Sequence, residues 1–255
     1  MSDRRPLTIA IVLGVIAIAI GIMLSFVIHW FPSAASTQAH NTDRLYHVLV
    51  IASIPIFVLV VTTVLYSVWQ FRMRPGEELK DGPPIHGNTR LEVFWTAIPT
   101  VLLLGLVGYS FVVLKENEKT PKREIDVEVT GQQFLWSYEY PHAITGGRPL
   151  KSDQLYVPEG ESVRFNLHSK DVIHAFWIPA FRIQEDVVPG ITTHWRATPD
   201  KIGNYAVVCN LLCGVGHSTM RSRIHVVSET KFHEWIQSQM SAAGASSTTA
   251  GGSAG

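Results

Sequence analysis

Three long apolar stretches in the first half of this 255-residue chain constrain its fold more than any other feature. They cover residues 7–30, 45–69 and 94–114. Each is close to or above the roughly 20 residues that a helix needs to cross a bilayer. The sequence therefore predicts that transmembrane helices anchor the N-terminal half in a membrane.

The basic residues predict how these helices are oriented. Arg4 and Arg5 precede the first stretch, and the loop over 71–91 is also basic, whereas the loop over 31–44 carries a single arginine. The basic residues of the 71–91 loop are Arg72, Arg74, Lys80 and Arg90. By the positive-inside rule the N-terminus and this loop face the cytoplasm, so the chain after about residue 114 faces outward.

The first stretch has two interpretations. Small residues at 33–36 offer a cleavage site for a secretory signal peptide. The apolar core is, however, longer than the usual 7–15 or so residues of such a signal, which favours a retained helix. Both interpretations stay open, and neither changes the orientation of the later segments.

The second half has the pattern of an all-β domain. Residues 124–129 alternate polar and apolar side chains, which is typical of a half-buried strand. Further strands are expected at 133–140, 154–157, 162–167, 192–196, 203–208 and 223–227. Turn-rich segments at 146–149 and 158–160 separate some of them. Many short strands over about 100 residues favour a β-sandwich or barrel.

Soft metal ligands are concentrated in one short loop. The only two cysteines of the chain, Cys209 and Cys213, are followed by His217 and Met220. Thiolate, imidazole and thioether together suit copper far better than magnesium or calcium. Two thiolates this close in sequence can bridge one pair of copper ions, with one histidine left for each metal. A second histidine must then come from elsewhere in the chain.

His174 is the best candidate for that second histidine. It stands in an apolar run, where a polar ring is costly unless it is paired or bound to a metal. Met220 would be a weak ligand to one copper, and the backbone carbonyl of Leu211 could serve the other. Two alternatives remain for the cysteines: a local disulfide outside the cytoplasm, and a share in a zinc site. A disulfide leaves the histidine and methionine spacing unexplained, and zinc rarely uses methionine.

The loop over 209–220, with the His-Ala-Phe-Trp-Ile-Pro run that begins at His174, resembles the dinuclear copper (CuA) site of cytochrome c oxidase subunit II. The segment over 86–99 resembles the same family independently. Family features match from about residue 45 to residue 240. The resemblance implies a membrane-anchored α+β chain, in which N-terminal transmembrane helices, two or three in number, precede an all-β cupredoxin-like Greek-key barrel.

The resemblance also implies a function. Such a subunit accepts electrons from soluble or membrane-bound cytochrome c at CuA and passes them to the haem-bearing subunit I. There oxygen is reduced to water, coupled to proton translocation. Cys209 and Cys213 would bridge the coppers, His174 and His217 would be terminal ligands, and Met220 and the Leu211 carbonyl would be weak axial ligands.

The implied partners are subunit I, the other oxidase subunits, cytochrome c and membrane lipid. The implied location is the plasma membrane of a bacterium, with the CuA domain on the outer side. The formal charge of zero gives no sign of nucleic acid. Two alternative functions remain, namely the CuA subunit of a nitric oxide reductase and a membrane-tethered copper-binding or copper-delivery protein.

Four further positions carry expectations from the family. Glu92 matches a carboxylate at the cytoplasmic entrance of a proton path, although a capping box with Thr89 would also explain it. Phe134 and Trp136 fall in the aromatic segment where electrons enter from cytochrome c. Leu211 stands where the family commonly has a glutamate that binds a magnesium at the boundary with subunit I, and a leucine side chain cannot bind it.

The sequence thus divides into four expected parts. They are an N-terminal transmembrane segment or signal with its outer loop (1–44), a transmembrane hairpin (45–117), the outer CuA domain (118–240), and a disordered low-complexity tail (241–255).

Overall fold

The computed structural model describes residues 5–73, 75–76, 84, 86–121 and 123–249. Arg4, Arg74 and Lys80, on which part of the predicted orientation rests, lie outside the described residues, as does the end of the predicted tail at 250–255. The chain forms two compact units. A helical unit contains Met1–Trp30 and Asp43–Leu114, and an outer unit contains Phe31–Thr42 and Lys115–Gly255.

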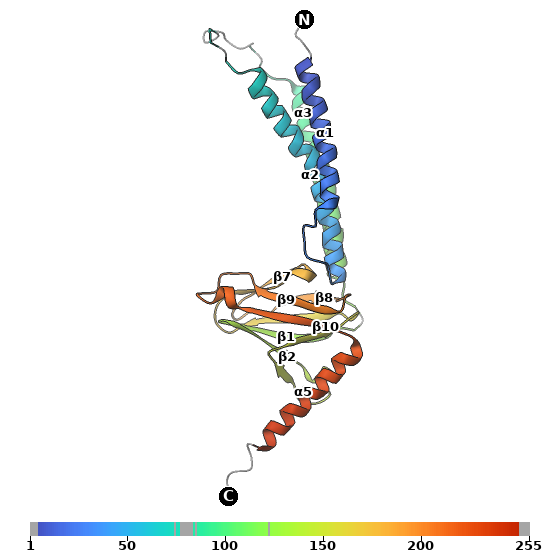
Figure 1. Ribbon diagram of the computed structural model, residues 1–255, viewed down its shortest axis with the longest axis vertical. Coiled ribbons are helices and arrows are strands. Elements are labelled where there is room, and N and C mark those ends of the chain that lie inside the picture. The colour runs from blue at the N-terminus through green and yellow to red at the C-terminus, as the bar shows by residue number, and fades with distance from the viewer. Residues whose placement is uncertain (1–4, 74, 77–83, 85, 122, 250–255) are drawn as a thin grey trace. The chain divides into compact units, whose positions relative to one another are not determined.

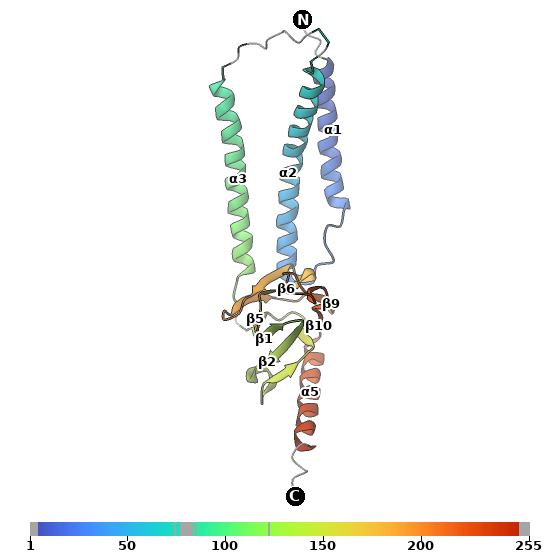
Figure 2. The ribbon, with the colours of Figure 1, turned by 90° about the vertical axis from the view of Figure 1, so that its left-hand side faces the viewer.

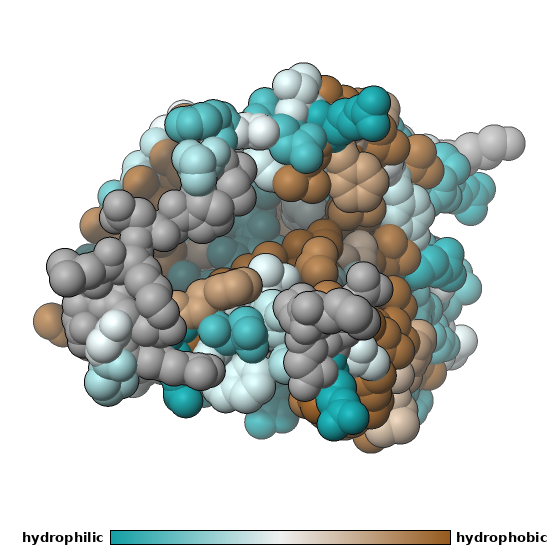
Figure 3. Space-filling view, turned by 90° about the horizontal axis from the view of Figure 1, so that it is seen from above, coloured by the Kyte–Doolittle hydropathy of each residue, from teal (hydrophilic) through white to brown (hydrophobic). Residues whose placement is uncertain are grey.

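Three long apolar helices confirm the predicted membrane anchor (Figures 1 and 2). They are α1 (Arg5–Val27), α2 (Thr37–Gln70) and α3 (Thr89–Asn117), and each is long and apolar enough to cross a membrane. Their apolar side chains are exposed rather than packed inside the protein, and Figure 3 shows many of them as brown surface. Such surface is stable only against lipid or another apolar partner.

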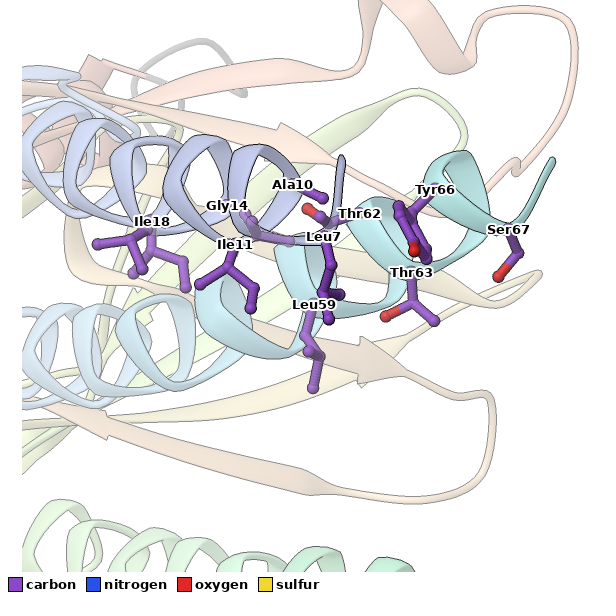
Figure 4. A pocket seen from close by; sticks show the side chains of 12 residues that line it. Leu7, Ala10, Ile11, Gly14, Ile18, Leu59, Thr62, Thr63, Tyr66 and Ser67 are labelled. Carbon is purple, nitrogen blue, oxygen red and sulfur yellow. The ribbon is translucent and has the colours of Figure 1, made fainter. Parts of the chain in front are cut away.

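Helices α1 and α2 approach each other closely through glycines. A Cβ atom added at Gly21 would lie 2.9 Å from Ile54 Cγ2, and one at Gly14 would lie 3.4 Å from Thr62 Oγ1. Small residues allow this close packing of helices in a membrane. Beside the contact is an apolar groove of about 510 Å³ between the two helices (Figure 4). Its lining includes Leu7 and Ile11 on α1 and Leu59 on α2.

The start of α3 differs from the capping box expected at Thr89. The cap is Asn88, whose Oδ1 accepts a hydrogen bond from the Leu91 N–H at 3.2 Å. Glu92 Oε1 in turn accepts a hydrogen bond from the Asn88 N–H at 3.3 Å. The reciprocal pair therefore keeps Glu92 but has Asn88 in place of Thr89 as the cap, in line with the stronger capping preference of asparagine.

The outer unit contains two five-stranded sheets that lie face to face (Figures 1 and 2). The first consists of β1 (Ile125–Gln132), β2 (Leu135–Tyr140), β3 (Leu150–Ser152), β5 (Val163–Ser169) and β8 (Thr193–Ala197), in the order β3-β2-β1-β5-β8. The second consists of β4 (Leu155–Pro158), β6 (His174–Ile178), β7 (Ile183–Val187), β9 (Gly203–Cys209) and β10 (Arg221–Val227), in the order β4-β10-β9-β6-β7. Strand β1 pairs in parallel with β5, and β4 pairs in parallel with β10. The chain therefore passes from one sheet to the other between these paired strands.

One hydrophobic core holds the two sheets together. Val127 and Phe165 from the first sheet, and Phe176 and Ile224 from the second, are at most 1% exposed. The rings of Phe165 and Phe176 meet across the layers with centroids 5.6 Å apart. This two-sheet domain agrees with the predicted cupredoxin-like architecture and positions the loops that carry the metal ligands.

Three strands were not expected from the sequence. They are β3, β6 and β7. Strand β6 is apolar on both faces because it lies inside the second sheet, between β9 and β7, so it shows no alternation. Strand β2 begins at Leu135 rather than at residue 133, because residues 133–134 form the turn after β1.

The segment over 31–42, which the sequence assigns to the N-terminal part, packs into the outer unit. Ala35 and Ser36 are fully buried. The Ala35 N–H donates to the Ala180 carbonyl at 3.0 Å, and Ser36 Oγ donates to the Phe181 carbonyl at 3.2 Å. Cleavage between Ala35 and Ser36 would place a charged terminus in this buried position, which is costly.

Helix α5 (Glu229–Thr249) follows β10. Phe232 and Ile236 are buried against the sheets, and Tyr140 packs on Trp235 with centroids 5.2 Å apart. The helix continues to Thr249, well into the segment expected to be disordered. Residues 241–249 include three alanines, which favour a helix, and one glycine with five serines and threonines, which favour it less, so the composition alone did not indicate this extension.

Candidate metal centre

The expected ligands come from two neighbouring strands and one loop. His174 begins β6 and Cys209 ends β9, and these strands pair so that Phe176 faces Cys209. The Cys209 N–H donates to the Met220 carbonyl at 3.1 Å, which closes the neck of the loop between β9 and β10. A short 3-10 helix, η2 (His217–Thr219), lies just before Met220.

The donor atoms form a continuous array. Cys209 Sγ lies 3.8 Å from His174 Nδ1 and 3.8 Å from Cys213 Sγ. Cys213 Sγ lies 3.6 Å from His217 Nδ1. The two cysteines are therefore central, with one imidazole on each side, although the two histidines are far apart in sequence.

Two weaker donors complete the array. Met220 Sδ lies 3.8 Å from Cys213 Sγ, and the Leu211 carbonyl accepts from the Cys209 thiol at 3.3 Å. Each cysteine thus has one weak donor beside it. Among the described residues, His174, Cys209 and Cys213 also form a group whose ligand atoms all lie within 4.8 Å of one another.

The centre is mostly shielded from water. His174 and Met220 are fully buried, and Cys209 and Cys213 are 2% and 4% exposed. Both cysteines are free thiols rather than a disulfide. Burial, together with the neighbouring Cys209 thiol, raises the pKa of Cys213 to about 11. Metal binding must therefore displace a proton from this thiol, as it does at other thiolate sites.

The donor set fits copper. It offers two sulfurs that can be shared, two imidazoles, a thioether and a carbonyl, which is a soft set with weak axial groups. A structural zinc site would instead take four tetrahedral nitrogen or sulfur ligands, and it would have no use for Met220 or the carbonyl. The Leu211 side chain offers no oxygen, so the boundary magnesium of the family does not fit here.

Asp171 fixes the orientation of His174. Its Oδ1 accepts a hydrogen bond from His174 Nε2 at 2.8 Å, so Nδ1 of the same ring faces Cys209. Partial desolvation opposes the charge on Asp171, but hydrogen bonds from the Gln133 N–H, from His174 and from the Val172 N–H outweigh it. They hold the pKa of Asp171 down at about 2. The carboxylate is therefore charged throughout the physiological range.

The turn between β1 and β2 also contacts the centre, in addition to β6 and the loop after β9. The Gln133 N–H donates to Asp171 Oδ2 at 2.7 Å, and its side-chain Nε2 donates to the Cys213 carbonyl at 2.6 Å. Phe134 packs against the loop so closely that a Cβ at Gly214 would lie 3.1 Å from its ring, and one at Gly216 would overlap it. Asp171 and Gln133 were given no role from the sequence, and the position of Asp171 three residues before His174 was the available signal.

The remaining candidates lie at different places. Trp136 is 3% exposed and packs edge-on against His174 and Phe176, with centroids 6.0 Å and 5.2 Å away. Phe134 is only half-buried, so it is the aromatic residue of this pair nearer the surface. Glu92 lies in the helical unit, in the first turn of α3, and not in the metal centre.

Comparison with known proteins gives consistent matches along the chain. Residues 23–113 match the family model described as cytochrome c oxidase subunit II, transmembrane domain, and residues 145–227 match its periplasmic domain. Cytochrome c oxidase subunit 2 of Thermostichus vulcanus is 29% identical over 84% of this chain and 82% of its own length. The Cereibacter sphaeroides protein of that name is 30% identical over 81% and 78%.

Among solved structures, the periplasmic domain of subunit II of cytochrome oxidase of Bradyrhizobium japonicum is 28% identical. It covers 48% of this chain and 98% of its own, with a TM-score of 0.44.

Fold and site together define a membrane-anchored protein with a cupredoxin-like outer domain and a soft-metal centre. The chain belongs to the cytochrome c oxidase subunit II family. It is therefore a subunit of an oxidase that associates with other oxidase subunits, and the family implies a copper centre. The domain that carries the centre corresponds to the family's periplasmic domain, on the outer side of the membrane.

Proposed function

We propose that this chain is the electron-entry subunit of a haem-copper terminal oxidase in a bacterial plasma membrane. It accepts electrons from cytochrome c at a dinuclear CuA centre and passes them to the haem-bearing subunit I. Reduction of oxygen to water there is coupled to proton translocation. The observation that carries the proposal is the array of His174 Nδ1, Cys209 Sγ, Cys213 Sγ and His217 Nδ1, with neighbouring atoms 3.6–3.8 Å apart.

Each donor has a proposed role that follows from its place in the array. Cys209 and Cys213 would hold the metal from the middle of the array, because each thiol has the other beside it. His174 and His217 are the terminal ligands, one beside each cysteine. Met220 and the Leu211 carbonyl would add weak donors, one beside each cysteine. A copper pair held there would supply a one-electron carrier. Because the electron would be shared between two metal ions, the ligands and solvent would rearrange little when it arrives or leaves.

The chain's own residues keep that geometry constant and dry. Strand pairing between β6 and β9 sets Phe176 opposite Cys209, which brings His174, at the start of β6, beside the Cys209 thiol. The Cys209–Met220 backbone hydrogen bond closes the loop. Burial of His174, Cys209, Cys213 and Met220 excludes water, which limits solvent reorganisation when charge moves. We assign electron entry to Phe134, which is partly exposed above the loop, and packing beneath the centre to Trp136.

Glu92 is the proposed entrance of a proton path. Its carboxylate accepts a hydrogen bond from the Asn88 N–H at the start of α3, and this helix is long and apolar enough to cross a membrane. The cap holds the carboxylate at the helix end, where protons from the adjoining aqueous phase can reach it.

Rapid mixing tests the electron-transfer step. Copper-loaded full-length chain in detergent is mixed with reduced cytochrome c, and the oxidation of the cytochrome is followed with the reduction of the copper centre. The proposal predicts that both change together, and that Cys213→Ser abolishes the transfer. A centre that binds copper, accepts no electron and readily gives the metal to a chelator would favour the copper-delivery alternative.

A further inference from the structure

We propose that Gln133 is a positioning residue of the metal centre. In this inference the segment over 131–134, which is the end of β1 and the turn after it, contributes no ligand but joins the two ligand-bearing segments to each other. One hydrogen bond of Gln133 reaches the segment that carries His174, and another reaches the loop that carries Cys213 and His217.

The first connection runs through Asp171. The Gln133 backbone N–H donates to Oδ2 of this carboxylate at 2.7 Å, while Oδ1 accepts from His174 Nε2 at 2.8 Å. Gly131, near the end of β1, lies against the same ring, since a Cβ there would be 3.1 Å from His174 Cδ2. The turn therefore contacts the histidine both directly and through its carboxylate partner.

The second connection is made by the side chain. Gln133 Nε2 donates to the Cys213 carbonyl at 2.6 Å, midway along a loop that has no strand partner there. The next residue, Gly214, has φ 136°, and a Cβ on it would lie 2.8 Å from Gln133 Nε2. Glycine is thus required at this position both by its backbone conformation and by the amide that rests on it.

The consequence is specific to Cys213 and His217. Cys209 is the last residue of β9, and Met220 directly precedes β10 and accepts the backbone hydrogen bond of Cys209. The middle of the loop, with Cys213, has no strand partner. The Gln133 amide and the Phe134 ring hold that middle in place. Without the amide, Cys213 should leave its position opposite Cys209 more often, and the donor spacing should vary.

The test uses the full-length chain in detergent, metal-free and reduced. Because Cys209 and Cys213 are its only cysteines, a thiol reagent reports on the centre alone. Three variants are compared. Gln133→Leu removes the side-chain amide, Gln133→Asn keeps the amide on a side chain shorter by one methylene, and Gln133→Lys places an ammonium donor at the same position. Gln132→Leu, a change at the neighbouring exposed glutamine, is the matched control. Circular dichroism checks that each variant folds.

Loss of one hydrogen bond should raise the labelling rate of Gln133→Leu and Gln133→Asn roughly fivefold. Gln133→Lys should label more slowly than Gln133→Leu, although a nearby positive charge alone would favour the reactive thiolate. The control should match the unmodified chain. The inference is overturned if both Gln133→Leu and Gln133→Asn label at the unmodified rate, or if the control Gln132→Leu labels as fast as Gln133→Leu.

The copper-loaded chain gives a second readout that rests on the proposed function. Gln133→Leu should broaden the copper hyperfine pattern in electron paramagnetic resonance and shift the midpoint potential, and Gln132→Leu should do neither. Unchanged spectra and potential in Gln133→Leu would also count against a positioning role. If the unmodified chain binds no copper, the proposed function fails, whereas thiol labelling still decides the role of Gln133.

Discussion

Asp171 and His174 form a hydrogen bond of 2.8 Å between Oδ1 and Nε2, and this bond turns the other ring nitrogen toward Cys209. The ring is fully buried, while the carboxylate remains partly exposed. A buried imidazole with a fixed orientation needs little rearrangement when a metal arrives, and a carboxylate partner also makes it a better ligand.

Replacing Asp171 with alanine should therefore weaken copper binding about tenfold to a hundredfold. The change removes the hydrogen-bond acceptor of His174 Nε2 but replaces no proposed ligand. The copper affinity of the variant is measured by competition with a chelator of known affinity. Asp153→Ala, at an exposed carboxylate in another loop, is the control and should bind as the unmodified chain does. Equal affinities for Asp171→Ala and the control would contradict the orienting role.

Ser36→Ala should destabilise the outer unit. Ser36 Oγ donates to the Phe181 carbonyl and accepts from the Ala39 N–H at the start of α2, all in a fully buried position. Loss of a helix cap and of a buried hydrogen bond should lower the free energy of unfolding by about 1–2 kcal/mol. Denaturation in detergent, followed by tryptophan fluorescence, measures it. Ser33→Ala, at an exposed serine of the same segment, should have little effect, and equal losses in both variants would argue against the packing of residues 31–42.

His225 should make the outer unit less stable in mild acid. Burial and the nearby positive charge of Arg223 lower the pKa of His225, whose Nδ1 donates to Asn204 Oδ1 at 2.6 Å. The unfolded chain takes up a proton near the ordinary value of about 6.5, before the folded chain does. Stability therefore falls as the pH decreases through about 6.5, and His225→Gln should flatten that fall. Identical pH profiles of stability for the two proteins would rule this out.

Leu211→Ala should leave copper binding intact. Only the backbone carbonyl of Leu211 lies beside Cys209, while its side chain is 37% exposed. The copper content and the paramagnetic resonance spectrum should therefore match those of the unmodified chain. A loss of copper would show that the side chain, and not only the carbonyl, is needed at the centre.

The ligands could be predicted from the sequence because five of the six lie within the loop over 209–220, and four of these five are soft side-chain donors of an unusual combination. His174 was found as a polar ring in an apolar run, and the structure brings it to Cys209. The same reasoning could not find Gln133. An exposed glutamine has no distinctive signal in a sequence, and its importance depends on how a turn meets two segments distant from it.

Periodicity predicted the fold where one face of an element meets water. It found β1, β5, β9 and β10 to within a few residues, and it failed for β6, which lies within the second sheet. It also gave no sign that residues 31–42 pack on the outer unit, because Ala35 and Ser36 are small and their burial depends on distant carbonyls at Ala180 and Phe181.

The central claim is that Cys209 and Cys213 hold a pair of copper ions. The most direct measurement is the copper content of the purified, copper-loaded full-length chain together with its electron paramagnetic resonance spectrum. The account predicts two copper ions per chain and the hyperfine pattern of one electron shared equally between both nuclei. One copper per chain, or an unpaired electron confined to a single nucleus, would contradict it.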